Sequence, residues 1–459
     1  MQSQQEFTGL RAHFWPIKIS DMKKFIPLFI IFMCLMTAST FIRDFTNIMI
    51  VNYHMENLSV VKFSSSFFLL GIIPLYLVGI HYFSPKKFFH TVLNVYIIGL
   101  AITYILSAFM PELLKNKPSS ILVLLDSFRL ITTVLCWTLV TQIFSIPDCK
   151  RVFPIFFVFI SFALIPITLL DVSFSFSNNK GIYLLLSIGL CLIAQYGYYY
   201  LYKNILSFDE KEGQDTPAET HISFTDSLKQ ALTSPTLYLL LLLMVLLYTS
   251  KHMFDSLIKD YLKTFLAISG DATYVSSKYN VFMGNILQMK GLIEVSFLVL
   301  AGVGLLYKKS WGFVARLIPI AIVTASIIML MLIALPDVSK YLGVIFHKTQ
   351  AEIYLYGSVF CTILISMFSS MFFILKGMVY FYLSKSEQTK GRIIFEFIGT
   401  VILGKMLSPY IATTLMMAQN TKNMADIAPF LLGIIFVCGL IMFWVVRLMS
   451  KRMQAVEHA

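Results

Sequence analysis

Nine charged side chains lie inside long apolar segments of this 459-residue chain, and they are its chemically most informative residues. They are Arg43, Asp126, Arg129, Lys251, Asp255, Lys290, Glu294, Glu396 and Lys405. An ionised side chain at the centre of a bilayer costs about 2.5–3.5 kcal/mol on insertion scales. Nine of them facing lipid would cost roughly 20–30 kcal/mol, so they must face one another, a watery cavity or a charged ligand. This arrangement is typical of a protein that moves a polar solute across a membrane.

Several of these charges are spaced as pairs on one helix face. Asp126 precedes Arg129 by three residues, and the pairs four residues apart are Lys251 with Asp255, Lys290 with Glu294, and Arg392 with Glu396. Two interpretations stay open. Either each pair neutralises itself so that its helix can insert, or the pairs line a cavity and exchange partners between outward-open and inward-open states. The second interpretation gives a coupling or gating role to Asp126, Lys251, Asp255, Lys290, Glu294 and Glu396.

Two cations have no partner at helical spacing. Lys405 has none, and Arg43 has only the adjacent Asp44, which is expected to point elsewhere on a helix. These two side chains are therefore the strongest candidates for binding an anionic group of a substrate.

The composition indicates an all-α polytopic membrane protein. Hydrophobic residues make up 58% of the chain and charged residues 13%, and the mean hydropathy is +0.78. Soluble domains are about a quarter charged. Twelve apolar runs are long enough to cross a bilayer: 25–50, 64–83, 88–110, 120–145, 152–171, 181–202, 236–262, 279–307, 316–335, 352–376, 392–417 and 427–449.

The basic residues near the ends of these runs predict the orientation. They concentrate on one side, for example at 18–24, 86–87, 150–151, 203–229, 308–316, 376–392 and 447–452. The positive-inside rule then places both termini in the cytoplasm, which agrees with an even number of spans.

A long polar stretch divides the spans into six and six, as in the major-facilitator architecture. The predicted organisation is a cytoplasmic N-terminal segment, a six-helix bundle, a central cytoplasmic loop, a second six-helix bundle and a cytoplasmic tail, at 1–24, 25–202, 203–235, 236–449 and 450–459.

Other classes of function are disfavoured. The net charge of +12 is mostly the topology pattern, so we expect no nucleic-acid partner. The six cysteines and eight histidines show no metal-ligand spacing, so we expect no metal and no cofactor. His252, beside Lys251 and Asp255, forms the only suggestive catalytic cluster, and we expect no enzyme. We expect the protein to be a monomer that contacts membrane lipids. We also expect its N-terminal segment not to be a signal peptide.

Motifs along nearly the whole chain resemble those of the non-mitochondrial ATP/ADP translocases of rickettsiae, chlamydiae and plastids. They occur in order and with nearly equal spacing: FWPIKISDMKKFIP (14–27), STFIRD (39–44), Trp137, Gln142, IPDCKR (146–151), ISFTDSLKQALTSP (222–235), FDSLIKDYLK (254–263), FMG (282–284) and KGMVYFYL…TKGR (376–392). The resemblance implies a major-facilitator-like fold. It also implies a secondary transporter of a nucleotide or related organic phosphate, working by alternating access and exchange, in the inner membrane of a bacterium.

Phosphate needs Lys or Arg donors, so with this resemblance we assign Arg43, Arg129 and Lys405 to substrate binding. The alternative within transport is proton-coupled symport of a nucleotide, NAD or another organic anion, with Asp126, Asp255 or Glu396 as proton carriers. A channel or an embedded enzyme fits the sequence less well.

The chain departs from the family pattern at positions that matter for substrate. A lysine expected in the first helix is replaced by Thr46, and an expected glutamate near Leu125 is matched only by Asp126, one residue later. A helix 7 glutamate is replaced by Asp255, and Lys405 is not followed by Ser-Gly-Gly. Losing a cation weakens the hold on a triphosphate most, so we expect no strong preference for ATP over less charged nucleotides.

Overall fold

The computed structural model describes most of the apolar segments and few of the polar loops. The described residues are 17, 19–54, 71–110, 118–144, 155–156, 158, 181–206, 225–226, 229, 233–267, 272–302, 305, 309–381, 383, 395–396, 398–399, 403–421 and 423–457. Most of the predicted central loop at 203–235 lies outside them.

All the regular elements in these described residues are helical. In chain order they are α2 (Ile19–His54), α4 (Ile72–Tyr82), α5 (Pro85–Phe109), α7 (Pro118–Ile143), α10 (Ile182–Asn204), α13 (Pro235–Ala267), α14 (Ala272–Phe297), the π-helical turn η1 (Leu298–Gly302), α16 (Trp311–Ala334), α17 (Pro336–Phe346), α18 (Gln350–Phe381), α20 (Gly404–Ala418) and α21 (Met424–Glu457). Helices satisfy their own backbone hydrogen bonds, which a bilayer interior requires.

Local sequence explains where several helices begin and end. Pro85 and Pro336 occupy the first helical position of α5 and α17, where the missing N–H is not needed. Ser310 caps α16 by accepting a hydrogen bond from the Phe313 amide. His347 ends α17 in a left-handed conformation with φ of 52°.

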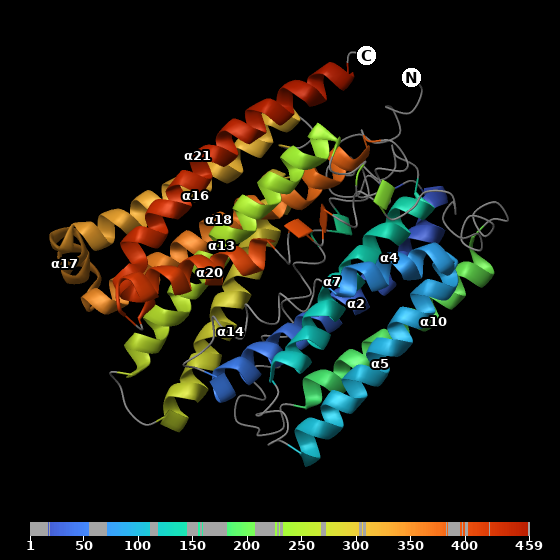
Figure 1. The fold of residues 1–459 in the computed structure, drawn as a ribbon, viewed down its shortest axis with the longest axis horizontal. Coiled ribbons are helices and arrows are strands. Elements are labelled where there is room, and N and C mark those ends of the chain that lie inside the picture. Colours follow the sequence, from blue (N-terminus) through green and yellow to red (C-terminus); the bar gives the residue numbers. More distant parts are fainter. Residues whose placement is uncertain are drawn as a thin grey trace.

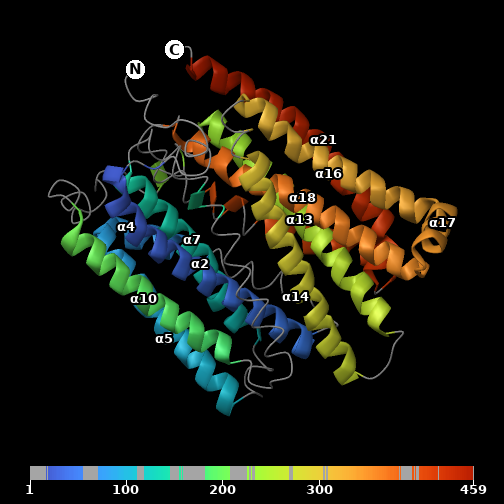
Figure 2. The ribbon, with the colours of Figure 1, turned by 180° about the vertical axis from the view of Figure 1, so that it is seen from behind.

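The helices gather into two groups that follow the order of the chain. In the N-terminal group α2 packs against α10 and α7, and α5 packs against α10. In the C-terminal group α13 and α16 each pack against α18 and α21. Figures 1 and 2 show the two groups from opposite sides, and α2 contacts α14 of the second group.

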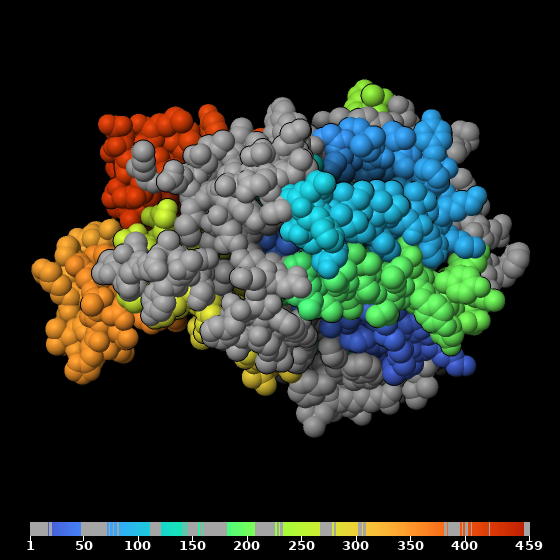
Figure 3. Space-filling model, turned by 90° about the horizontal axis from the view of Figure 1, so that it is seen from below, coloured from blue at the N-terminus to red at the C-terminus, as the bar shows by residue number. Residues whose placement is uncertain are grey.

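The space-filling view agrees with this division. Seen from below, the N-terminal helices in blue to green and the C-terminal helices in yellow to red occupy opposite sides of the molecule (Figure 3). Residues from both halves can therefore meet only at the junction between the two groups.

Nine helices in the described part of the chain are long and apolar enough to cross a membrane. The other predicted spans, at 64–83, 152–171 and 392–417, lie partly or mostly outside the described residues, with α4 and α20 covering parts of two. The start of α2 and the end of α21 lie at the same end of the molecule (Figure 1). An even number of crossings joins two such ends.

Two features were not expected from the apolar runs. The short helix α17 follows α16 directly, and its Tyr341, Val344 and Phe346 are exposed. Helices α16 and α21 also approach closely, because a Cβ at Gly439 would lie 2.6 Å from the Val323 side chain. Small residues permit such close packing between membrane helices.

Candidate functional site: a charge cluster between the two halves

Helix α2 contributes an ion pair between neighbouring residues. Arg43 Nε donates to Asp44 Oδ1 at 3.4 Å, and the two side chains are 26% and 6% exposed. The expectation that Asp44 points away from Arg43 is therefore wrong. A long guanidinium side chain can bend back along its helix to reach a neighbour that a rigid i, i+1 geometry would exclude.

Helix α7 contributes the pair that its spacing predicts. Arg129 Nη1 donates to Asp126 Oδ1 at 3.2 Å. The prediction that these two residues share a helix face is confirmed. Their side chains are partly buried, at 28% exposure for Arg129 and 12% for Asp126.

Helix α13 contributes a pair that differs from the predicted one. Asp255 forms its ion pair with Lys259, at 2.8 Å, one turn further along the helix. Lys251, the predicted partner, donates instead to the Ser369 hydroxyl of α18 at 2.8 Å. An acid with lysines at both i−4 and i+4 prefers the lysine that follows it, because this order suits the helix dipole.

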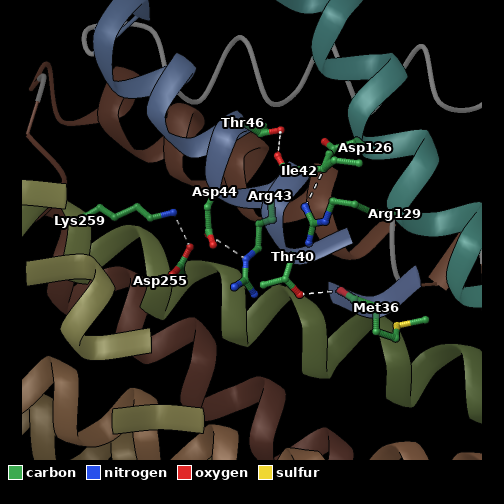
Figure 4. Close-up of polar contacts among 10 residues, drawn as sticks. All are labelled: Met36, Thr40, Ile42, Arg43, Asp44, Thr46, Asp126, Arg129, Asp255 and Lys259. Carbon is green, nitrogen blue, oxygen red and sulfur yellow. Dashed lines mark hydrogen bonds and ion pairs between the residues drawn. The ribbon is translucent and has the colours of Figure 1, made fainter. Parts of the chain in front are cut away.

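These three pairs converge where the two halves meet. Figure 4 shows the side chains of Arg43 and Asp44 facing the Asp255–Lys259 pair, with the Arg129–Asp126 pair on the neighbouring helix. The Asp44 carboxylate is close enough for attraction by both Arg129 and Lys259, in addition to Arg43. We call these six residues from α2, α7 and α13 the central charge cluster.

The central charge cluster is balanced in charge but not in hydrogen bonds. It holds three cations and three carboxylates, namely Arg43, Arg129 and Lys259 with Asp44, Asp126 and Asp255. Among the described residues, two of its buried atoms have no hydrogen-bond partner: Arg43 Nη2 and Asp44 Oδ2. Buried polar atoms are normally satisfied, so such atoms point to a ligand or water that completes them.

Thr46, where the family resemblance leads one to expect a lysine, is buried at 5% exposure. Its hydroxyl donates to the Ile42 carbonyl of its own helix at 2.7 Å. The hydroxyl is therefore satisfied without a ligand, and the cations near it come from Arg43 and Arg129 instead.

Other predicted site residues lie apart from these six. Lys290 and Glu294 on α14 form no ion pair with each other in the described part of the chain, although both interact electrostatically with Lys251. Lys405 lies in the first turn of α20, and its side chain is outside the described residues. Among the described residues, no group of three or more His, Cys, Asp or Glu is arranged to hold a metal.

Glu396 has a partner that the sequence did not suggest. Arg392, its predicted partner, lies outside the described residues, whereas Lys376 Nζ of α18 lies 2.8 Å from Glu396 Oε1. Both side chains are 6% exposed, and Lys376 also lies 5.3 Å from the centre of the Phe373 ring. Lys376, one of the basic residues near the helix ends, is therefore held in a buried ion pair near the end of α18.

The chain can now be compared with known proteins. The model of the TLC family, described as TLC ATP/ADP transporter, matches residues 1–117 and 125–454. ADP,ATP carrier protein 1 of Chlamydia trachomatis is 20% identical over 96% of this chain and 90% of its own length. ADP,ATP carrier protein 1 of Rickettsia typhi is 20% identical over 71% of this chain and 66% of its own length.

Solved structures show the same architecture. The major facilitator superfamily transporter FucP, in its outward conformation, superposes with a TM-score of 0.64 at 14% identity, covering 94% of this chain and 99% of that one. A bacterial homologue of the iron transporter ferroportin superposes with a TM-score of 0.62 at 10% identity, covering 95% and 100%. The predicted major-facilitator-like fold is confirmed. The family match extends over nearly the whole length, and the chain belongs to the TLC ATP/ADP transporter family.

Proposed function

We propose that this protein exchanges one nucleotide for another across a membrane by alternating access, with the central charge cluster as the substrate site. The observation that carries this proposal is the meeting of charged side chains from α2 and α7 with those of α13 at the junction of the two halves. Transporters of this architecture bind their cargo near the bilayer midplane between their halves. The ADP,ATP carrier names of the relatives support a nucleotide as cargo.

The cations suit a phosphate chain. A guanidinium presents a planar fork of donors that matches phosphate oxygens, and such charge-assisted bonds are the strong ones in a desolvated site. Arg43, whose Nη2 has no hydrogen-bond partner in the described part of the chain, and Arg129 are therefore proposed to hold phosphate from the N-terminal half. Lys405 is proposed to approach it from the C-terminal half.

Charge balance suggests how binding is coupled to movement. A phosphate that takes Arg43 and Arg129 competes with Asp44 and Asp126, which are their ion-pair partners in the structure. A released Asp44 carboxylate is then drawn more strongly to Lys259 of the other half, which already attracts it. Cargo binding would in this way strengthen the attraction between the halves and favour closure.

Exchange requires a nucleotide on the opposite side of the membrane from the labelled one, whereas proton symport requires a proton gradient. Purified protein in proteoliposomes should take up labelled ATP when ADP is loaded inside, and take up far less when the vesicles are empty. Uptake into empty vesicles that follows an imposed pH gradient would instead support symport, with Asp126, Asp255 or Glu396 as proton carrier.

The variant Asp255→Asn should fold normally and transport poorly. The Asp255 side chain is 39% exposed, so its pair with Lys259 adds at most about 1 kcal/mol to folding. If this pair changes partners during the cycle, however, its loss acts on the transport rate, which falls tenfold for each increase of about 1.4 kcal/mol in the barrier. Transport is measured in proteoliposomes at equal protein content, with Asp337→Asn on the exposed helix α17 as matched control.

Adding Lys259→Gln to Asp255→Asn should leave transport low, because neither partner then remains to switch. A transport rate of Asp255→Asn equal to wild type would mean that the pair serves only insertion of α13.

We also propose that the protein is a monomeric transporter, not an enzyme, in a bacterial inner membrane with both termini and residues 203–235 in the cytoplasm. The distribution of basic residues supports this orientation. Single cysteines introduced at 203–235 should react with a membrane-impermeant thiol reagent only after the cytoplasmic face is opened to it. Labelling of that segment in intact cells would show that it faces outward and would contradict the proposed orientation.

A further inference from the structure

Lys251 is a charged side chain at the middle of α13 that has no carboxylate partner among the residues described. Its Nζ atom donates to Ser369 Oγ at 2.8 Å, and no carboxylate oxygen among the described residues lies within the 4.0 Å of an ion pair. An ammonium group inside a membrane bundle is strongly disfavoured unless its charge is compensated. A neutral hydroxyl compensates it only in part.

The charges around Lys251 leave an excess of positive charge. Lys290 of α14 repels it, and Glu294 and Asp255 attract it. Asp255, however, already forms its 2.8 Å ion pair with Lys259. Lys251 and Lys290 therefore bring two positive charges against the single Glu294 carboxylate, and neither forms an ion pair with it in the described part of the chain.

A second observation on α18 points in the same direction. The hydroxyl oxygens of Thr362 and Ser366 are buried and have no hydrogen-bond partner among the described residues. Thr362, Ser366 and Ser369 follow one another at intervals of four and three, which places them on one face of α18. The Ser369 hydroxyl, which accepts from Lys251, donates to the Ser366 carbonyl at 3.1 Å. A hydroxyl can turn to donate to an oxyanion instead, so Ser369 and the neighbouring Ser366 can act as donors on this face near the ammonium of Lys251.

We propose that Lys251, Lys290 and Ser369 form a second anion subsite, which takes a phosphoryl group of the nucleotide. We call these three residues the C-terminal lysine subsite, and the proposal rests on the nucleotide transport proposed above. Lys251 lies one helical turn from Asp255, a rise of about 6 Å, so one extended cargo can reach from the central charge cluster into the subsite. The central charge cluster is neutral, whereas the subsite supplies the net positive charge that a phosphate chain needs.

The test compares two competitors that differ by one phosphate. Uptake of labelled ADP into ADP-loaded proteoliposomes is inhibited with unlabelled ATP or ADP, and the half-inhibitory concentration of each is measured. For Lys251→Gln we expect the value for ATP to rise about tenfold and that for ADP about threefold or less. Lys251→Arg should keep the wild-type ratio, because it keeps the charge.

A second variant is expected to shift the half-inhibitory concentration of ATP in the opposite direction, which a general folding defect would not do. Glu294→Gln removes the nearby carboxylate, so it should lower the half-inhibitory concentration of ATP relative to that of ADP. Lys340→Gln, on the exposed surface of α17, should leave both values at wild type.

The outcomes separate the two proposals. Wild-type protein that transports no nucleotide contradicts the proposed function and the subsite together. The other outcome is that the wild-type protein transports nucleotides, while Lys251→Gln and Glu294→Gln both keep the wild-type ratio of the half-inhibitory concentrations of ATP and ADP. That result overturns the subsite and leaves the proposed function standing. If Lys251→Gln does not fold, the ratio measured for Glu294→Gln decides alone.

Discussion

Glu396→Gln should destabilise the protein by about 3–5 kcal/mol. Its carboxylate lies 2.8 Å from Lys376 Nζ, and both side chains are almost fully buried. Neutralising the acid removes the carboxylate charge that lies 2.8 Å from a buried ammonium, which is far more costly than losing an exposed pair. Thermal unfolding of the purified protein in detergent should show a clear fall in melting temperature against wild type.

Two further variants test whether the fall in melting temperature comes from an unbalanced buried charge. The double change Lys376→Met with Glu396→Gln should recover most of the lost stability, because the buried ammonium is removed together with the carboxylate. Asp337→Asn breaks the exposed 3.9 Å pair with Lys340 and should leave the melting temperature unchanged. A Glu396→Gln protein as stable as wild type would mean that the Glu396 carboxylate is not the counter-charge that holds Lys376 in the folded state.

Arg43→Gln and Arg129→Gln should each reduce transport roughly 30-fold to several thousand-fold. Each removes one charged donor to phosphate from a desolvated site, a loss of about 2–5 kcal/mol in binding. At about 1.4 kcal/mol for each factor of ten, that energy corresponds to the stated range. Uptake is measured in ADP-loaded proteoliposomes with ATP at a concentration below its wild-type KM, so that losses of affinity are visible.

Lysine substitutions at the same positions test whether geometry matters as well as charge. Arg129→Lys keeps the charge but loses the planar fork, so it should recover only part of the transport lost in Arg129→Gln. Variants that unfold are identified by loss of the wild-type melting transition. Full transport by folded Arg43→Gln and folded Arg129→Gln would contradict the assignment of both residues to phosphate.

Helix geometry explains which parts of the site can be predicted from the sequence. The Asp126–Arg129 pair follows from a spacing of three, because residues at this interval share a helix face. Asp255 has two lysines at helical spacing, and only the preference for an acid that precedes its lysine favours Lys259 over Lys251. That preference can be read from the sequence alone.

Other contacts depend on tertiary packing that no local spacing contains. Lys376 and Glu396 are 20 positions apart and meet only because their segments lie side by side. The Lys251–Ser369 bond likewise joins α13 to α18. The approach of Asp44 to Lys259 depends on how the two halves sit together, which the count of apolar runs cannot give.

The fold was more predictable than the site for a physical reason. Long apolar runs must become membrane helices, because only helices satisfy the backbone of each such run in lipid. A short segment such as α17 escapes this argument, since it is too short to cross a bilayer and too apolar to read as a loop. The polar stretch at 203–235 is predicted to divide the chain, and α10 before it and α13 after it pack in different helix groups.

The most direct measurement is protein-dependent uptake of labelled ATP into ADP-loaded proteoliposomes, with adenosine and phosphorylated nucleosides as competitors. If cations of the central charge cluster hold the phosphate chain, uptake saturates, and nucleotides compete for it while adenosine at the same concentration does not. Vesicles without the protein serve as the control. Competition by adenosine as strong as that by ADP, or no uptake beyond that of protein-free vesicles, would contradict nucleotide exchange through this cluster.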